Sequence, residues 1–123
     1  MEDDDATRGL IDVVFREAGY VVDQARDGIE ALEAVRLAPP DLIVLDRQMP
    51  RMDGTEFVDR YRKLRGDHAP IVALCAAVDC PEWARSIGAA AALTKPFGID
   101  ELASIVSRIL QATATAARET APR

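Results

Sequence analysis

One aspartate, Asp46, follows an apolar run and stands where a strand would end. Residues 42–45 carry no charge, which is typical of a strand buried on both faces, and the run stops at Asp46. A polar loop broken by a proline comes next, and Asp53 and Gly54 then open a helix. Ligands bind at the carboxyl ends of the strands in open α/β sheets. The pattern therefore predicts that Asp46 lies at a ligand-binding edge, although a single aspartate there is more often a turn residue or a helix cap.

Asp46 has companions at three other places in the chain. An acidic pair stands near the start, a small residue follows a later apolar strand, and a Lys-Pro pair follows a further one. These residues are Asp3 and Asp4, Cys75, and Lys95. In this order, and separated by helical stretches, they resemble the receiver domain of two-component response regulators. The resemblance covers residues 2–110, which is nearly the whole chain.

The resemblance implies a role for each of these residues. Asp46 would accept a phosphoryl group from a histidine kinase or a phosphotransfer protein. Asp3, Asp4, Asp46 and the backbone carbonyl of Gln48 would bind a divalent cation. Three carboxylates at one edge repel each other unless a cation lies among them, and hard oxygen donors favour Mg²⁺. Lys95 would supply a second positive charge, because phosphoryl transfer depends on positioning and charge neutralisation.

Taken by themselves, the N-terminal acids have two simpler interpretations. Residues 1–5 read Met-Glu-Asp-Asp-Asp, which is typical of an acidic tail. Apolar residues at helical spacing follow, so Asp4 or Asp5 is also a candidate cap at a helix N-terminus, where negative charge is favoured. The order of the family's motifs is what favours metal binding by Asp3 and Asp4.

Two positions depart from the family pattern. Cys75 stands where the family usually carries threonine or serine, whose hydroxyl moves to the phosphoryl group, and a thiol is a weaker donor. Ala92 stands where the family often places an aromatic residue. Both departures favour an alternative function, that of a degenerate receiver that binds partners independently of phosphorylation. Cys75 itself is either a redox-sensitive thiol or an inert packing residue, and nearby anions, which disfavour thiolate, favour inert packing.

The resemblance implies an α/β fold of the flavodoxin-like, doubly wound type, with a parallel sheet of strand order 2-1-3-4-5 and helices on both faces. The patterning predicts strands at 20–25, 42–45, 71–74 and 89–93. The first strand of the family, an apolar run before the acids, is truncated or missing. We therefore expect that the natural chain starts further upstream, that another segment fills the slot, or that a second copy supplies a strand by homodimerisation or strand exchange.

Helical spacing and stop signals predict five helices. The first follows the acids and ends at Gly19, the second runs from Asp27 to the prolines at 39–40, and the third covers 55–64. A short helix begins at Pro81 and contains Trp83, and the last covers 99–112. We expect one receiver domain at 1–112 and a C-terminal tail at 113–123.

Composition limits the partners and the location. A net charge of −6 argues against direct nucleic-acid binding, which needs excess lysine and arginine. The longest uncharged run, 69–78, is too short to cross a membrane, and no signal peptide precedes the fold. Two cysteines, Cys75 and Cys80, have neither zinc-ligand company nor a secreted context. The chain is therefore expected to be cytoplasmic.

A signalling domain is not expected to be an enzyme beyond its own phosphotransfer and dephosphorylation. The enzymatic alternative is a phosphatase with an aspartyl nucleophile. Its usual Asp-x-Asp arrangement needs an acid two residues after Asp46, where this chain has Gln48. The phosphatase alternative therefore ranks last.

Overall fold

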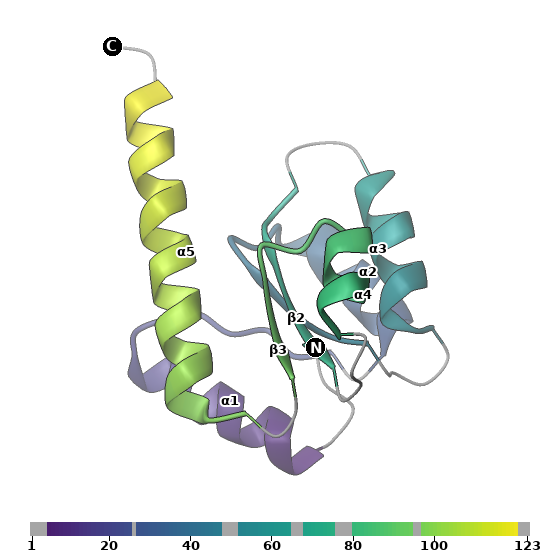
Figure 1. The fold of residues 1–123 in the computed structure, drawn as a ribbon, viewed down its shortest axis with the longest axis horizontal. Helices are drawn as coiled ribbons and strands as arrows, with labels where there is room; N and C mark the ends of the chain where they lie inside the picture. Colours follow the sequence, from purple (N-terminus) through teal and green to yellow (C-terminus); the bar gives the residue numbers. More distant parts are fainter. Residues whose placement is uncertain are drawn as a thin grey trace.

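The computed structural model describes residues 5–25, 27–47, 52–64, 68–75, 80–94 and 97–120. In this part of the chain, three parallel strands form one sheet in the order β1-β2-β3. The strands are β1 (Ile43–Asp46), β2 (Ile71–Cys75) and β3 (Ala91–Thr94). The helices are α1 (Asp5–Glu17), α2 (Gly28–Leu37), α3 (Gly54–Arg62), α4 (Cys80–Ser86) and α5 (Ile99–Thr120). The expected α/β class with a parallel, flavodoxin-like sheet is confirmed (Figure 1).

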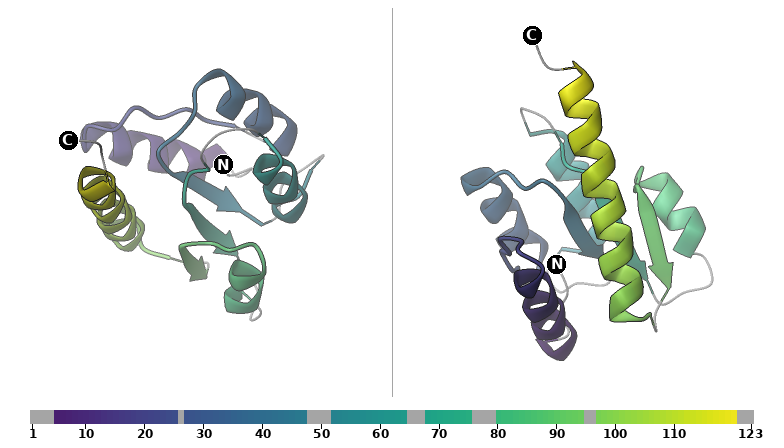
Figure 2. Two further views of the ribbon diagram at one scale, coloured as in Figure 1. Left: turned by 90° about the horizontal axis from the view of Figure 1, so that it is seen from above. Right: turned by 90° about the vertical axis from the view of Figure 1, so that its left-hand side faces the viewer.

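Helices cover both faces of the sheet (Figures 1 and 2). Helices α2, α3 and α4 pack on one face, and α1 and α5 pack on the other. The central strand β2 is buried along its whole length and divides its side chains between the two cores. Ile71, Ala73 and Cys75 belong to the core under α2–α4, whereas Val72 and Leu74 belong to the core under α1 and α5. This alternation is the period-two geometry of a strand with a core on each side.

Several helix ends carry the capping and stop residues that the sequence indicates. The Asp27 carboxylate caps α2 by accepting from the backbone N–H of Glu30 at 2.9 Å. Asp53 caps α3 in the same way. After α1, Gly19 has φ 96, a backbone conformation that glycine adopts without a steric cost. The predicted helices following the acids, Asp27 and Asp53 are therefore confirmed.

The prediction of a strand at 20–25 is wrong for this structure. These residues lie outside any strand, between α1 and α2. The segment is hydrogen-bonded to α1 instead. Tyr20 N donates to Phe15 O at 3.0 Å. Arg16 Nη2 donates to Val22 O at 2.7 Å. A strand needs a neighbouring strand for its backbone groups. Within the described residues no strand lies between this segment and β1 to provide one.

The last helix is longer than the sequence analysis predicted. Helix α5 continues from Ile99 to Thr120, past the expected end at Ala112 (Figure 1). The segment that follows Ala112 is rich in alanine and has no glycine or proline before Pro122, so nothing in its composition stops a helix. Within the described residues, no helix is long and apolar enough to cross a membrane.

Candidate functional site

Asp46 lies at the carboxyl end of the sheet, as predicted. It is the last residue of β1 and is 2% exposed. It stands opposite Leu74 in the parallel register, and the next residue, Arg47, donates its N–H to Leu74 O at 3.0 Å. On β2 the following residue is Cys75, which is paired in register with Thr94 of β3. The ends of the three strands therefore bring Asp46, Cys75 and Thr94 to one edge of the sheet.

The backbone that follows Asp46 returns close to it at the start of α3. Gly54 N donates to Arg47 O at 3.0 Å. A Cβ atom at position 54 would lie 2.9 Å from Asp46 O, 3.0 Å from Trp83 Cζ2 and 3.1 Å from Arg47 Cα. Only glycine fits this approach without a shift of the backbone. Gly54 therefore lets α3 begin directly against the peptide of Asp46.

Trp83 of α4 forms one wall of this region. The sequence predicted that Trp83 lies in a helix, but it did not predict these contacts. The side chain is buried, and its indole N–H donates to Thr55 Oγ1 at 2.7 Å. The guanidinium of Arg47 lies 5.4 Å from the centroid of the indole ring, which is a cation–π distance. Helix α4 is thereby in contact with the residue next to Asp46. The sequence did not indicate this contact, because the contact depends on how α4 packs against the sheet.

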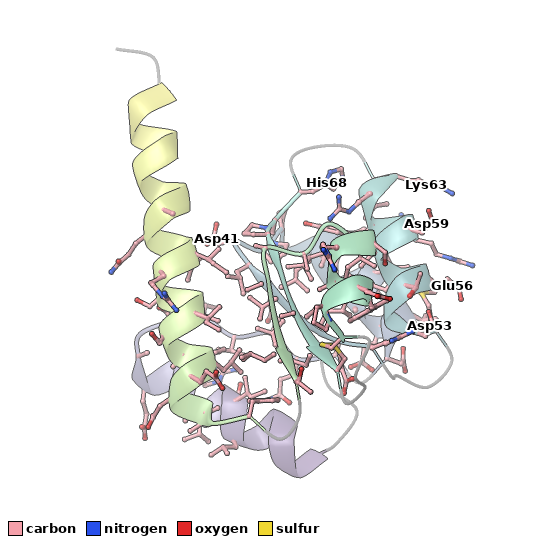
Figure 3. The ribbon with its side chains drawn as sticks, in the orientation of Figure 1. Asp41, Asp53, Glu56, Asp59, Lys63 and His68 are labelled. Carbon is pink, nitrogen blue, oxygen red and sulfur yellow. A yellow bond between two sulfur atoms is a disulfide. The ribbon has the colours of Figure 1, made fainter. Side chains whose placement is uncertain are left out.

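Cys75 is joined to Cys80 by a disulfide (Figure 3). Cys75 is buried, as inert packing would require, but it is not the free thiol that this interpretation assumed. The two Cα atoms are 5.6 Å apart, which is within the usual range for a disulfide, and both residues are buried. The bond connects the last residue of β2 to the first residue of α4. A possible signal in the sequence was two cysteines five positions apart across a strand end and a helix start.

Several predicted site residues lie outside the described part of the chain. These residues are Asp3, Asp4, Gln48 and Lys95. Among the residues that are described, no three histidine, cysteine, aspartate or glutamate side chains form a metal-binding group. Ala92 is described, and it packs half-buried against the core under α2–α4. Of the predicted set, the structure thus brings Asp46 and Cys75 to the same edge.

A parallel sheet with helices on both faces, and a buried aspartate at the end of one strand, defines a flavodoxin-like domain with a site at the carboxyl edge. The sequence profile of one family, the response regulator receiver domain, matches residues 1–107. The chain belongs to this family, whose members are the phosphoacceptor domains of two-component response regulators.

Curated relatives agree with this assignment. The chain is 39% identical over 115 residues to response regulator MprA of Mycobacterium leprae, covering 92% of this chain and 50% of that protein. It is 33% identical over 112 residues to sporulation initiation phosphotransferase F of Bacillus subtilis, covering 89% of this chain and 90% of that protein. The chain therefore spans about half the length of the MprA proteins that it matches.

Solved receiver structures have the same fold. The receiver domain of Francisella response regulator 1452 superposes with a TM-score of 0.82 at 32% identity, covering 91% of this chain and 93% of that chain. The chemotaxis response regulator CheY4 of Vibrio cholerae superposes with a TM-score of 0.80 at 32% identity, covering 88% and 92%.

Proposed function

We propose that this chain accepts a phosphoryl group on Asp46 from a histidine kinase or a phosphotransfer protein. The observation that carries the proposal is the position of Asp46, which is buried at the end of β1 beside the ends of β2 and β3. This is the edge at which α/β sheets bind ligands. The proposal places the chain in the cytoplasm, where its phosphodonor would be found.

The set of residues proposed to bind the cation fits Mg²⁺ by its chemistry. The set consists of the carboxylates of Asp3, Asp4 and Asp46 and the backbone carbonyl of Gln48, all of them hard oxygen donors. Of these, Asp46 is the residue that the structure describes, and the proposal is supported by its burial at the last position of β1. When bound, Mg²⁺ would neutralise phosphoryl oxygens during the transfer. Lys95 follows β3 directly in the sequence and is proposed to add a second positive charge.

The proposed reaction is an in-line displacement at phosphorus. A carboxylate oxygen of Asp46 forms the new P–O bond while the P–N bond to the donor histidine breaks, and the histidine takes up a proton. Hydrolysis of the acyl phosphate then restores the carboxylate and releases inorganic phosphate. The chain is proposed to turn over no other substrate, because its product is its own phosphorylated state.

Intact-mass measurement after incubation with acetyl phosphate and Mg²⁺ tests the proposal. We expect a gain of one phosphoryl group in the native chain and none in Asp46→Asn. Asp53→Asn is the matched control, because Asp53 is exposed, and asparagine also caps helices well. It is expected to gain the same mass as the native chain. A native chain that gains no mass, or an Asp46→Asn variant that does, would refute the assignment.

A second candidate is a receiver that binds its partners independently of phosphorylation. The observation that favours it is the disulfide of Cys75, which leaves no hydroxyl or free thiol at position 75 to move toward a phosphoryl group. Ala92 likewise has no side-chain rotamer that changes. This candidate predicts that a partner binds equally well to the chain before and after phosphorylation of Asp46.

We also propose that two copies of the chain associate through strand exchange. The support is residues 20–25, which have the pattern of a strand and lie outside the sheet. Light scattering of the chain in solution is expected to show a dimer. A monomer at all concentrations would eliminate the exchange.

A further inference from the structure

The disulfide lies where two elements of the proposed site meet. Cys75 follows Leu74, the residue that stands opposite Asp46 and accepts the N–H of Arg47. Cys80 is the first residue of α4, and Trp83 on the same helix lies against Arg47. The sulfur bridge therefore ties α4 covalently to the strand beside Asp46. The other described contacts between α4 and this region are non-covalent.

We propose that Cys75 and Cys80 are a redox-active pair whose oxidised form fixes α4 against the end of β2. The pair would exchange with low-molecular-weight thiols and disulfides. The inference rests on the proposed function and location, because disulfides in the cytoplasm of most organisms are usually transient and serve redox sensing or catalysis. Phosphorylation at Asp46 and oxidation at Cys75 would then act on the same helix.

The chemistry of the pair balances with a small disulfide as the oxidant. One cysteine thiolate attacks a sulfur of the small disulfide, forms a mixed disulfide and releases one thiolate. The second cysteine then attacks the sulfur of the first, forms the Cys75–Cys80 bond and releases the second small thiolate. The protein loses two protons and two electrons, and the small disulfide is reduced to two thiols. Excess small thiol reverses both steps.

The surroundings accommodate the reduced form as well as the oxidised one. Cys80 Sγ lies 3.8 Å from Leu93 O, which is a suitable acceptor for the thiol proton when the bond is broken. Both sulfurs are buried, so a small thiol reaches them only when α4 moves away from β2. Helix α4 has seven residues, and so short a helix depends on its packing for stability. The bond should therefore exchange through local opening of α4.

The first test asks whether the pair cycles. The full chain is equilibrated in mixtures of reduced and oxidised glutathione, and alkylation followed by mass spectrometry counts the free thiols. We expect one transition from two free thiols to none, with reversal on adding excess reduced glutathione. Two free thiols under all mixtures, or a bond that native conditions never reduce, would overturn the proposal.

The second test asks whether the bond restrains α4. Backbone amide exchange in α4 is expected to slow at least about tenfold on oxidation, because a covalent link to β2 removes conformations from the opened state. Cys80→Ser, with Cys80→Ala as a second variant, should exchange at the rate of the reduced chain in both mixtures. Equal rates in the oxidised and reduced native chains would overturn the inference.

The third test separates this inference from the proposed phosphotransfer. In the reduced chain, phosphorylation is expected to change the emission of Trp83, the one tryptophan of the chain, and oxidation should remove most of that change. A change of equal size in both forms would overturn the inference. In Asp46→Asn the effect of oxidation on amide exchange should remain. If the native chain gains no phosphoryl mass but still shows that effect, the proposed function fails and the redox pair stands.

Discussion

Replacing Gly54 by alanine is expected to destabilise the domain, although alanine is the better helix former. Gly54 is the first residue of α3. An added Cβ would lie 2.9 Å from the backbone oxygen of Asp46 and 3.1 Å from Cα of Arg47. Real Cβ atoms essentially never approach another atom to 2.9 Å, and a distance of 3.1 Å is tighter than nine in ten real Cβ contacts. Backbone atoms also give way less easily than the end of a side chain.

The size of the loss follows from two opposing effects. Overpacking a well-packed site costs about 1–3 kcal/mol. Better helix propensity returns at most about 1 kcal/mol. From the middle of the packing cost, we therefore expect the free energy of unfolding to fall by about 1–2 kcal/mol. Each kcal/mol corresponds to a fall in Tm of roughly 4 °C. The same shift moves the peptide of Asp46, so phosphorylation by acetyl phosphate should also slow.

Gly9→Ala is the matched control. Gly9 is inside α1, and a Cβ there would have no heavy atom within 4 Å. Its replacement should stabilise the domain by about 0.5–1 kcal/mol. Urea denaturation of both variants measures the two effects under the same conditions. If Gly54→Ala were as stable as the native chain, the close approach of α3 to Asp46 would be incorrect.

Three further outcomes test other contacts of the described residues. Arg62→Met should lower the free energy of unfolding by about 1 kcal/mol, because it removes hydrogen bonds to two carbonyls at the end of α4. Arg60→Met removes an exposed ion pair and should lower it by less than about 0.5 kcal/mol. Urea denaturation compares the two variants. Trp83→Phe should cost about 1–2 kcal/mol, and part of this should vanish in a Thr55→Val background, as a double-mutant cycle would show. The hydrogen bond from Arg16 holds the pKa of Asp12 below its ordinary value. The stabilisation from this pair is therefore present above the ordinary pKa and is lost as the pH falls through the lowered pKa. NMR titration of Asp12 would follow this loss.

Local signals were sufficient to predict most of the elements. A charge-free run that stops at Asp46 identified β1, and capping aspartates identified the starts of α2 and α3. The predicted strand at 20–25 did not form, because a strand depends on a neighbouring strand as well as on its own alternation of residues. The end of α5 was predicted wrongly, because an alanine-rich stretch without glycine or proline is compatible with both a tail and a helix.

The sequence predicted the parts of the site that lie at strand ends. It did not predict the contacts that depend on tertiary packing. The carboxyl ends of parallel strands meet at one edge, so the neighbourhood of Asp46 and Cys75 followed from two apolar runs. The bond from Cys75 to Cys80 and the contact from Arg47 to Trp83 depend on the path between β2 and α4. Sequence separation alone does not determine that path.

The basic residues on the outer side of α3 are paired with acidic residues of the same helix. On its outer side, Glu56 pairs with Arg60 at 3.0 Å and Asp59 pairs with Lys63 at 3.3 Å, each one turn apart (Figure 3). The outer face of α3 therefore carries charges of both signs. Arg62 differs from these residues, because it reaches the carbonyls of the turn after α4. Phosphate binding needs unneutralised lysine and arginine, which this face does not concentrate.

The contacts around Asp46 make α4, more than β3, the element placed to respond to it. Arg47 lies against Trp83, and Cys80 bonds the start of the same helix to the strand next to Asp46. Ala92 on β3 offers only a methyl group packed against the core. A cation–π contact of this kind is worth about 0.5–2 kcal/mol and can be rearranged by a new charge at Asp46, whereas a covalent bond cannot. Oxidation and phosphorylation should therefore oppose each other at α4, with the sulfur bridge restraining a helix that the phosphoryl group would otherwise displace.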